Sequence, residues 1–317
     1  MTSHKVKATV IVAAWCAEDM LARSVRSALA QEIRSLEVIV VDDASPDGTA
    51  RIARDLMRED PRVRVLGLDR NGGPAAARNA AIEAARGDWL VILDSDDQMR
   101  PDRLSRMIAL AERVGADCVY DDLQPVDPEG RPLGPSHLAG LNIAAPQRWS
   151  LERFLAGCGA RPGQAALGYL KPVLRRSFLM RHGLRYDPDL RNGEDFHLIA
   201  ELLAIGGILW FLPEPGYLYT LRPGSVSRRL DPGHARALSR ADTAFRRRHA
   251  ETLGREARRL MRIRRRNLSD LAAAESAVLA IKARKPFRAM VTLLLRPSAA
   301  IRLIRQIRDG RARRKAA

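Results

Sequence analysis

The stretch Glu37-Val-Ile-Val-Val-Asp42, followed at once by Asp43-Ala-Ser-Pro-Asp-Gly-Thr49, decides the fold of this chain. Its apolar residues are β-branched and continuous, which is typical of a strand buried on both faces of a parallel sheet. Pro46-Asp-Gly48 predicts a turn, and Thr49–Glu59 has the amphipathic spacing of a helix. A buried strand that leads through a turn into a helix is the repeating unit of an α/β protein.

The residues on either side repeat this alternation of strand and helix. Ala8–Ala14, Arg62–Leu66 and Trp89–Leu93 predict further strands, while Ser24–Gln31 and Pro74–Arg86 predict helices. Strands and helices that alternate at this spacing form a parallel, doubly wound sheet. We therefore expect an α/β fold with a Rossmann-like, mostly parallel sheet flanked by helices.

The middle of the chain is less regular. Pro125–Pro146 is rich in proline and glycine and predicts a long loop. Phe178–Ile205 has a helical pattern at both ends, around the turn Asn192-Gly-Glu-Asp195, and Trp210–Leu221 predicts a closing strand.

The positive charge of the chain is concentrated near its C-terminus. The net charge is +17, yet residues 1–230 hold thirty basic and thirty acidic residues. Residues 231–317 hold 24 basic and 7 acidic residues, in a helical pattern with arginine clusters such as Arg246–Arg248. This asymmetry predicts a neutral domain over 1–230, a basic helical extension over 231–317, and an anionic partner for the extension.

The cysteines and the apolar segments indicate the cellular compartment in which the protein works. Cys16, Cys118 and Cys158 are far apart in sequence, which argues against a disulfide framework or a zinc site and fits a reducing cytosol. We expect all three to be buried thiols. Ala8–Ala14 is too short for a signal peptide, and no uncharged apolar stretch approaches the ~20 residues that span a bilayer. These features predict a soluble or peripheral protein.

Acidic clusters follow two of the predicted strands. Asp42-Asp43 ends the second strand, and Asp94-Ser95-Asp96-Asp97 ends the fourth. Ligands of open α/β sheets bind at the carboxyl ends of the strands. Neighbouring carboxylates repel one another, and a divalent cation would relieve that repulsion. Oxygen ligands suit Mg²⁺ or Mn²⁺, especially beside a diphosphate.

Each cluster also has a purely structural interpretation. Asp42-Asp43 fits a turn and a helix cap, and Glu194-Asp195 fits a helix N-terminus. Asp94–Asp97 fits a cap for a helix starting near Pro101, but three carboxylates in four residues exceed what capping requires. The glycine-rich Asn71–Asn79 leads into a helix whose N-terminus suits an anion.

Together these motifs resemble the family 2 glycosyltransferases with a GT-A fold, over about Thr9 to Ser227. The ordered set consists of Val10–Trp15, Val40–Thr49, Asn71–Asn79, Leu93–Asp97 and Gly193–Asp195. Each motif is weak alone, whereas their order and spacing are specific. Gly168–Pro172 and His182–Asp195 are most similar to bacterial exopolysaccharide glucosyltransferases of the succinoglycan type.

The resemblance implies a role for each matching position. Asp42 or Asp43 would bind the uracil of a UDP-sugar, in a pocket lined by Ala13 to Trp15. Asp94 and Asp96 would hold the metal that binds the diphosphate, and Asp195 would be the catalytic base. The implied donor-binding residues are Ala13, Trp15, Asp42, Asp43, Arg78, Asp94, Ser95, Lys171 and Glu194. The family often has proline and tyrosine where this chain has Ala13 and Trp15, and a tryptophan still stacks on a base.

The expected reaction is an inverting transfer of a sugar, glucose by resemblance, from a UDP-sugar to a saccharide acceptor in surface polysaccharide synthesis. The acceptor hydroxyl would attack the anomeric carbon while Asp195 takes its proton. A nucleotide-sugar-binding scaffold without activity is the alternative, and intact Asp94, Asp96 and Asp195 argue against it. A nucleotidyltransferase would need a basic, glycine-rich phosphate loop near the first strand, which Ala13–Asp19 does not provide.

The basic extension has three interpretations. The first is attachment to anionic lipid at the cytoplasmic face of the cell membrane, where each Lys or Arg contributes ~1 kcal/mol, beside a lipid-linked acceptor. The second is a helical cap on the catalytic domain with a solvated basic face. Nucleic acid ranks third, because Phe245 and Phe287 are the only aromatic residues available for base stacking.

Overall fold

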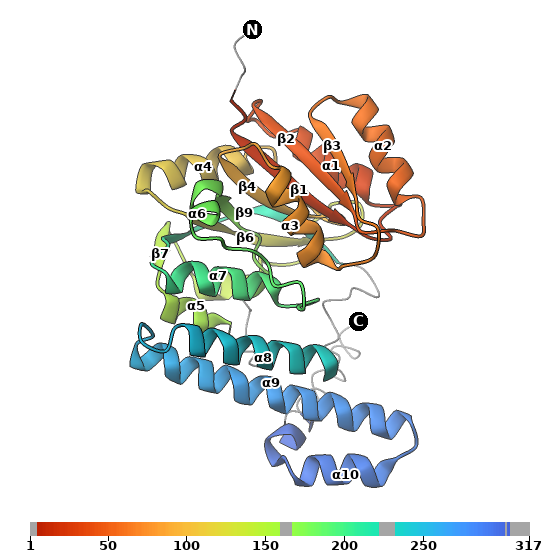
Figure 1. Cartoon of the computed structure of the whole chain (residues 1–317), viewed down its shortest axis with the longest axis vertical. Coiled ribbons are helices and arrows are strands. Elements are labelled where there is room, and N and C mark those ends of the chain that lie inside the picture. Colours follow the sequence, from red (N-terminus) through yellow and green to blue (C-terminus); the bar gives the residue numbers. More distant parts are fainter. Residues whose placement is uncertain (1–4, 159–166, 222–231, 302, 305–317) are drawn as a thin grey trace. The chain divides into compact units, whose positions relative to one another are not determined.

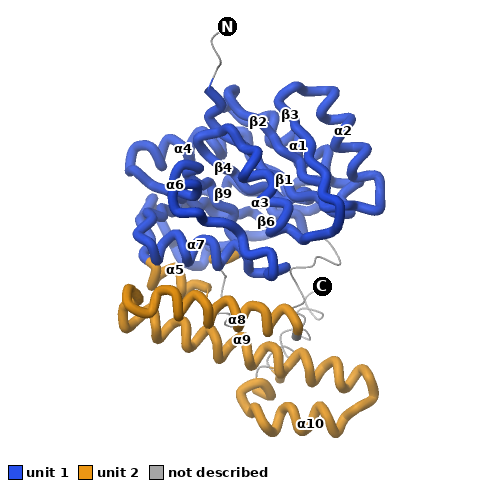
Figure 2. Tube along the Cα trace, in the orientation of Figure 1, with its two compact units in different colours: residues 1–150, 169–225 blue, residues 151–168, 226–317 orange. Residues whose placement is uncertain are grey.

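Figure 1 shows a computed structural model of the chain, in which residues 5–158, 167–221, 232–301 and 303–304 are described. The chain forms two compact units (Figure 2): Met1–Ser150 with Tyr169–Ser225, and Leu151–Gly168 with Val226–Ala317. The predicted boundary at residues 230 and 231 lies outside the described residues, as do residues 222–227 of the resemblance. The division into domains 1–230 and 231–317 stays a prediction.

The first unit is built on a nine-stranded sheet of order β3-β2-β1-β4-β8-β6-β9-β5, with β7 paired to β9. The strands are β1 Ala8–Ala14, β2 Leu36–Asp42, β3 Val63–Gly67, β4 Trp89–Asp94, β5 Gln98–Met99, β6 Cys118–Val126, β7 Gln147–Trp149, β8 Val173–Arg175 and β9 Leu209–Thr220. β1, β2, β3 and β4 pair in parallel, as do β6 and β9. The antiparallel pairings all involve the short strands β5, β7 and β8.

Helices flank this sheet (Figure 1). Those of the first unit are α1 Leu21–Leu29, α2 Thr49–Glu59, α3 Pro74–Ala84, α4 Arg103–Val114, α6 Arg176–Arg181 and α7 Glu194–Ala204. Short 3₁₀ turns cover Ala139–Leu141 and Leu167–Tyr169. The predicted α/β architecture with a mainly parallel, helix-flanked sheet is confirmed.

The two central strands form the core as their sequences predict. Val10–Val12 are fully buried, and every residue of β2 is buried, including Glu37. The Glu37 carboxylate accepts hydrogen bonds from Thr9 Oγ1 at 2.8 Å, the Arg86 backbone N–H at 2.7 Å and Arg64 Nη1 at 3.0 Å. Burial would raise the pKa of Glu37, but these donors and the charge of Arg64 lower it instead. A charged group is therefore stable inside the sheet.

Three local expectations need correction. α1 begins at Leu21 rather than Ser24, because the buried stripe of that helix already starts at Leu21. The predicted loop Pro125–Pro146 opens with the end of β6 and contains the Ala139–Leu141 turn. Cys16 is exposed rather than buried, since it lies in the loop after β1.

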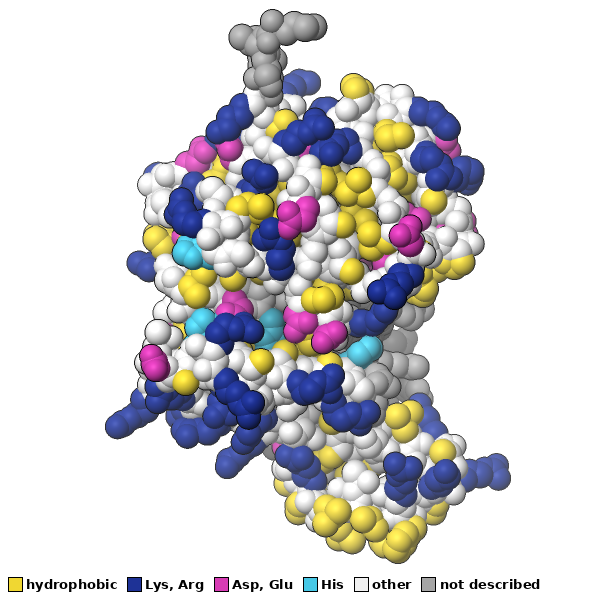
Figure 3. Space-filling view, viewed as in Figure 1, with side chains coloured by type: hydrophobic (Ala, Val, Ile, Leu, Met, Phe, Trp, Pro, Cys, Tyr) yellow, Lys and Arg dark blue, Asp and Glu magenta, His cyan; other side chains and the backbone are white. Residues whose placement is uncertain are grey.

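The second unit is helical. It comprises α5 Leu151–Gly157, α8 Pro232–Arg248, α9 Arg255–Lys282 and α10 Pro286–Leu294. Arg264 of α9 joins three segments, since its Nε lies 3.3 Å from Asp242 Oδ1 of α8 and its Nη1 donates to the Cys158 carbonyl at 2.7 Å. Figure 3 shows Lys and Arg side chains crowded over these helices. Of the basic helical extension predicted over 231–317, residues 232–301 and 303–304 are described.

No helix among the described residues has the length and apolar character needed to cross a bilayer.

A buried ion pair braces the first unit beneath the carboxyl ends of its strands. Arg103 of α4 and Asp121 of β6 have no exposed side-chain surface, and Arg103 Nε and Nη2 donate to the carboxylate at 2.9 and 2.8 Å. Nη2 also donates to the Lys171 carbonyl at 2.7 Å, and Asp121 accepts from the Gly216 N–H at 3.1 Å. The pair thus connects α4 and β6 with the chain at Lys171 and with β9.

Replacing Arg103 with alanine leaves the Asp121 carboxylate buried without its cation. We expect Arg103→Ala to lower the free energy of unfolding in urea by about 3–5 kcal/mol. Arg106→Ala is the matched control, because Arg106 pairs with Asp102 in a partly exposed position at the start of the same helix, and exposed pairs contribute about 0–1 kcal/mol. Equal losses in both variants would contradict this account of the pair.

Candidate active site

The sheet register brings the two acidic clusters together around β1. Ala13 lies opposite Asp94 of β4, and Ala14 lies opposite Asp42 of β2. The carboxyl ends of β2 and β4 therefore flank the end of β1, as expected from the open-sheet rule. Ser95 and Asp96 continue beyond β4 in the turn that follows it.

The loop after β1 is fastened to the loop after β2. The Cys16 N–H donates to Ser45 Oγ at 3.2 Å, and the Ala17 N–H donates to Thr49 Oγ1 at 2.8 Å. Cys16 and Ala44 both have positive φ angles, of 50° and 55°, which non-glycine residues rarely adopt. Such strain concentrates at ligand sites. Trp15 is held here with 52% of its surface exposed, as a ring available for stacking.

The paired aspartates after β2 do different things. Asp43 accepts hydrogen bonds from the backbone N–H groups of Gly72 at 2.7 Å and Gly73 at 2.8 Å, one on each carboxylate oxygen. Gly73 has a φ of 83°, which favours glycine. Asp42 Oδ1 accepts from the Ser45 N–H at 3.3 Å. Asp43 therefore shapes the glycine-rich loop, while Asp42 faces the loop after its own strand.

Arg78 of α3 joins residues that are distant in sequence. Its side chain is almost completely buried. Nη2 donates to Asp94 Oδ1 at 2.8 Å, while Nη1 donates to Glu194 Oε1 at 2.7 Å and to Asp195 Oδ1 at 3.2 Å. The guanidinium also lies over the Tyr186 ring, 5.3 Å from its centre. The planar fork of arginine suits this simultaneous contact with several carboxylates.

Lys171 supplies a second cation to the same cluster. Its Nζ lies 2.8 Å from Asp94 Oδ2 and 3.2 Å from Asp195 Oδ2. Burial would raise the pKa of Asp94, but the charges of Lys171 and Arg78 outweigh it and lower the pKa to about 2. Asp94 is thus ionised at neutral pH. We call the five residues Arg78, Asp94, Lys171, Glu194 and Asp195 the charged network.

Glu194 and Asp195 occupy the first turn of α7. Gly193 precedes them with a φ of 80°, and this turn places both carboxylates at the helix N-terminus, where negative charge is favoured. Both side chains are buried. Burial, followed by the charge of Asp195, raises the pKa of Glu194. The start of α7 and the burial of two acidic side chains thus coincide at this position.

The acidic turn after β4 is held by Tyr217 of β9. The Tyr217 hydroxyl accepts a hydrogen bond from the Asp94 N–H at 3.1 Å and donates to Asp97 Oδ2 at 2.8 Å. The Thr220 N–H donates to the other oxygen of Asp97 at 2.7 Å. Burial, with the charges of Asp96 and Asp94, raises the pKa of Asp97 well above its usual value. Asp97 therefore anchors the turn.

The turn fits a divalent cation. Carboxylate oxygen atoms of Asp94, Asp96 and Asp97 lie within 4.8 Å of one another. Asp97 is buried, with both oxygens hydrogen-bonded to Tyr217 and the Thr220 N–H, whereas Asp94 and Asp96 are partly exposed. Asp94 and Asp96 are therefore the better ligands, although Asp94 also contacts Arg78 and Lys171. A carboxylate oxygen has further lone pairs beyond a single hydrogen bond, and an all-oxygen donor set suits Mg²⁺ or Mn²⁺.

The structure thus gathers the predicted residues around one end of the sheet and adds some that the sequence did not reveal. Tyr217 lies in an apolar, aromatic strand pattern that carries no sign of a polar role. Arg191 is a second residue that the sequence did not reveal. Its Nη1 donates to Asn71 Oδ1 at 2.6 Å, and its side chain lies against Gly73. Both act through contacts with distant segments, which no local pattern reveals.

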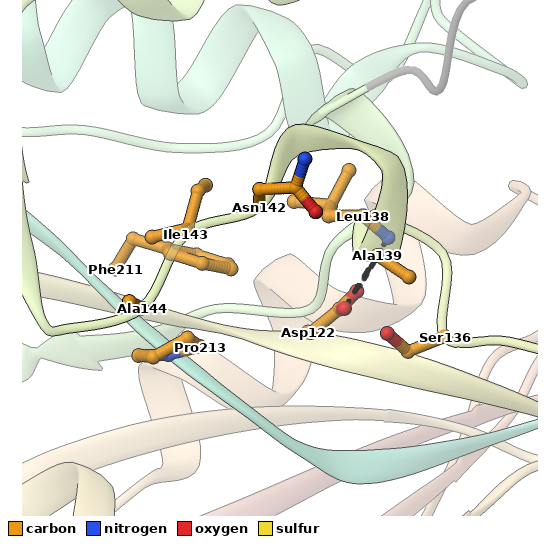
Figure 4. Close-up of a pocket in the computed structure, with 9 residues that line it drawn as sticks. All are labelled: Asp122, Ser136, Leu138, Ala139, Asn142, Ile143, Ala144, Phe211 and Pro213. Carbon is orange, nitrogen blue, oxygen red and sulfur yellow. Dashed lines mark hydrogen bonds between the residues drawn. The ribbon is translucent and has the colours of Figure 1, made fainter.

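A separate hollow of about 400 Å³ lies beside β6 and β9 in the first unit (Figure 4). Asp122 and Phe211 line it, together with Leu138, whose N–H donates to Asp122 Oδ1 at 3.0 Å. Burial raises the pKa of Asp122 despite this hydrogen bond. The hollow includes no residue of the charged network, and its carboxylate holds the loop that follows β6.

Comparisons with known sequences identify relatives of this chain. Residues 9–166 match the family described as Glycosyl transferase family 2. The succinoglycan biosynthesis protein ExoO of Rhizobium meliloti is 44% identical over 242 residues, which cover 76% of this chain and 68% of that protein. The putative teichuronic acid biosynthesis glycosyltransferase TuaG of Bacillus subtilis is 39% identical over 72% of this chain and 84% of its own length.

Solved structures show the same fold. S. aureus TarS 1–349 in complex with UDP-GlcNAc is similar with a TM-score of 0.62 at 18% identity, over 90% of each chain. The mannosyltransferase PcManGT from Pyrobaculum calidifontis, in complex with GDP-Man and Mn²⁺, has a TM-score of 0.58 at 18% identity, over 95% of this chain and 88% of its own. At these identities the likeness establishes the fold.

Removing the Tyr217 hydroxyl tests whether β9 holds the acidic turn. We expect Tyr217→Phe to weaken Mn²⁺-dependent binding of UDP by about tenfold, since Asp94 and Asp97 lose a shared partner worth about 1–1.5 kcal/mol. Calorimetric titration of UDP, with and without Mn²⁺, measures this. Tyr120→Phe removes a buried phenol oxygen elsewhere in the sheet and should leave UDP affinity unchanged. Unchanged affinity in Tyr217→Phe would show that the turn keeps its shape unaided.

Proposed function

This chain belongs to glycosyl transferase family 2, and we propose that it transfers glucose from a UDP-sugar donor to a hydroxyl of a saccharide acceptor, with inversion. One observation carries the proposal: Arg78 and Lys171 join Asp94, at the end of a central strand, to Asp195 at the start of α7. A donor-side carboxylate and a candidate base are thus held in one buried cluster.

The donor would lie across the ends of β1, β2 and β4. We assign the uracil to Asp42, beside the exposed ring of Trp15 and the backbone at Ala13, because Asp43 is committed to the glycine-rich loop. Ser95, in the turn after β4, would lie near the ribose and diphosphate. Arg78 and Lys171 provide positive charge on the diphosphate side, from groups that are already desolvated.

The reaction is a single displacement. The acceptor oxygen forms a bond to the anomeric carbon as the bond from that carbon to the diphosphate oxygen breaks. Asp195 takes the proton of the attacking hydroxyl, and the nucleoside diphosphate leaves with the bonding electron pair. Lys171 and Arg78 fix the Asp195 carboxylate from two sides, so the base is oriented before the substrate arrives. Attack opposite the leaving group inverts the anomeric centre.

Asp94 and Asp96 would hold a divalent cation, Mg²⁺ or Mn²⁺, and Asp97, which is hydrogen-bonded to Tyr217 and Thr220 of β9, would support the turn. When bound, such a cation supplies positive charge where the leaving diphosphate becomes more negative. Two similar structures, PcManGT and GalNAc-T7, are described with Mn²⁺, which supports this assignment.

The names of the relatives support a role in polysaccharide synthesis. ExoO and ExoU of Rhizobium meliloti are succinoglycan biosynthesis proteins, and TuaG is assigned to teichuronic acid. We infer an exopolysaccharide or other surface polysaccharide as the product and a lipid-linked saccharide as the acceptor. The enzyme would then work as a peripheral protein on the inner face of the cell membrane, attached to anionic lipid by its basic C-terminal helices.

Removing the charge of Asp195 should slow sugar transfer and leave donor binding intact. We expect Asp195→Asn to lower the rate of transfer by about 10²–10⁴-fold, the usual contribution of a general base, with UDP affinity nearly unchanged. Radiolabel transfer to acceptor and UDP titration measure the two quantities. Asp189→Asn, at an exposed carboxylate in the loop before α7, is the control and should transfer at the normal rate. Substantial transfer by Asp195→Asn would remove Asp195 as the base.

The metal assignment is tested at Asp96. In Asp96→Asn, we expect Mn²⁺ no longer to strengthen UDP binding, because one of two proposed ligands is lost. Titration of UDP at increasing Mn²⁺ measures this. Asp88→Asn, at the opposite end of β4, removes the same charge and should keep the full effect of Mn²⁺. An unchanged response to Mn²⁺ in Asp96→Asn would contradict the assignment.

A further inference from the structure

Helix α10, Pro286–Leu294, leaves a row of large apolar side chains in water. Phe287 is 73% exposed and Leu294 is 69% exposed, and Met290 and Val291 between them are exposed as well. Figure 3 shows hydrophobic side chains gathered over this helix, with Lys and Arg beside them. Single exposed apolar residues are ordinary, whereas a cluster of this kind marks a surface that binds a membrane or another protein.

These residues form one face because of their spacing. Phe287, Met290, Val291 and Leu294 follow the i, i+3, i+4, i+7 pattern, which places them on a single stripe of the helix. The side of α10 that packs inward is a different one: Ala289 is buried with Ala277 and Ala280 of α9, and Leu293 packs against them. α10 is therefore apolar on two sides, and packing on α9 uses only one.

Positive charge borders this face. Lys282, Arg284, Lys285 and Arg288 are all exposed, and no ion pair joins them to an acidic residue of the described chain. From Ser276 to Arg308 the sequence contains eight basic residues and no acidic residue. Along the preceding part of α9, by contrast, acidic residues such as Glu256 and Asp270 are present and pair with arginines.

We propose that the exposed face of α10, formed by Phe287, Met290, Val291 and Leu294, inserts into the headgroup region of an anionic lipid bilayer. The surrounding Lys282, Arg284, Lys285 and Arg288 contact the lipid phosphates. An apolar stripe bordered only by cations matches the two layers of such a membrane: hydrocarbon below and negative charge above. A soluble acidic protein would match the cations, but it would also need an apolar groove that fits four large side chains.

This inference deepens the proposal that the C-terminal helices attach to anionic lipid, and it is independent of sugar transfer itself. It adds that attachment needs insertion of apolar side chains and not charge alone. The two contributions have different signatures. Charge attraction weakens with salt and vanishes on zwitterionic lipid, whereas insertion persists in salt.

The test is co-sedimentation of the full-length protein with vesicles of phosphatidylcholine alone or mixed with phosphatidylglycerol. The wild type should bind the mixed vesicles. Phe287→Ser combined with Leu294→Ser should weaken that binding about tenfold or more, because two large apolar side chains no longer leave water. Met57→Ser combined with Leu133→Ser, also at exposed apolar positions, is the matched control and should bind as the wild type does.

A second pair of variants separates insertion from charge. Lys285→Gln combined with Arg288→Gln should weaken binding to the mixed vesicles and reduce its salt dependence. Phe287→Trp should retain binding and shift its fluorescence to shorter wavelength when mixed vesicles are added, as a ring entering a less polar phase does. Melting curves and UDP affinity of all variants should match the wild type, since every substituted side chain is exposed.

Three outcomes would overturn the inference. In the first, the variant with Phe287→Ser and Leu294→Ser binds like the wild type while the glutamine variant does not. Attachment is then electrostatic only, so insertion is wrong and the proposed attachment to anionic lipid stands without it. If the wild type binds no vesicle, both proposals about the membrane fail while donor binding remains testable. In the third, the wild type self-associates in ultracentrifugation, and the variant with Phe287→Ser and Leu294→Ser does not, while its vesicle binding is unchanged. The face is then an interface between copies of this chain.

Discussion

One buried guanidinium connects the residues of the candidate active site. Arg78 reaches Asp94 with one nitrogen and Glu194 and Asp195 with the other, so a single rigid group sets the spacing of three carboxylates. Without it, three acids would share a desolvated volume, and their repulsion would force protonation or separation. Lys171 adds a second positive charge, in contact with Asp94 and Asp195. Everything proposed about donor and base depends on this arrangement.

The rest of the fold serves to place these groups. The sheet register sets Asp94 beside Ala13 and Asp42 beside Ala14, which fixes the spacing of the two residues that we assign to the diphosphate and to the uracil. Arg103, itself fully buried, binds the carbonyl of Lys171 and so holds the second cation by its backbone. A rigid support of this kind allows charged groups to be oriented before a ligand binds, which is where much of electrostatic catalysis originates.

The features that could be predicted from sequence are those that local pattern encodes. The β-branched run of β2 and the acidic turn after β4 were recognisable because burial and turn chemistry act over a few neighbouring residues. Asp195 was different, since taken alone a helix cap explained it better, and only its place in an ordered set of motifs suggested a base. In the structure, contacts with Arg78 and Lys171 explain how a carboxylate is held at this position.

Other features could not be read from the sequence, because they arise from contacts between distant segments. Tyr217 pairs with Asp97 across 120 positions of the chain, and nothing in its strand distinguishes it from a core residue. The separate roles of Asp42 and Asp43 emerge only once Gly72 and Gly73 fold back onto Asp43. The grouping of Leu151–Gly168 with the C-terminal helices likewise depends on long-range contacts, among them that of Arg264 with the Cys158 carbonyl.

The central claim is that one cluster of charges forms a site for a nucleoside diphosphate and its sugar. The most direct measurement is the melting temperature of the purified protein with a panel of nucleoside diphosphates and nucleotide sugars, each with and without Mn²⁺. A ligand at about 100 times its dissociation constant adds ~2.7 kcal/mol of stability, which a melting curve resolves. The account predicts stabilisation by UDP and by a UDP-sugar that is larger with Mn²⁺ present. No stabilisation by any nucleotide under either condition would contradict it.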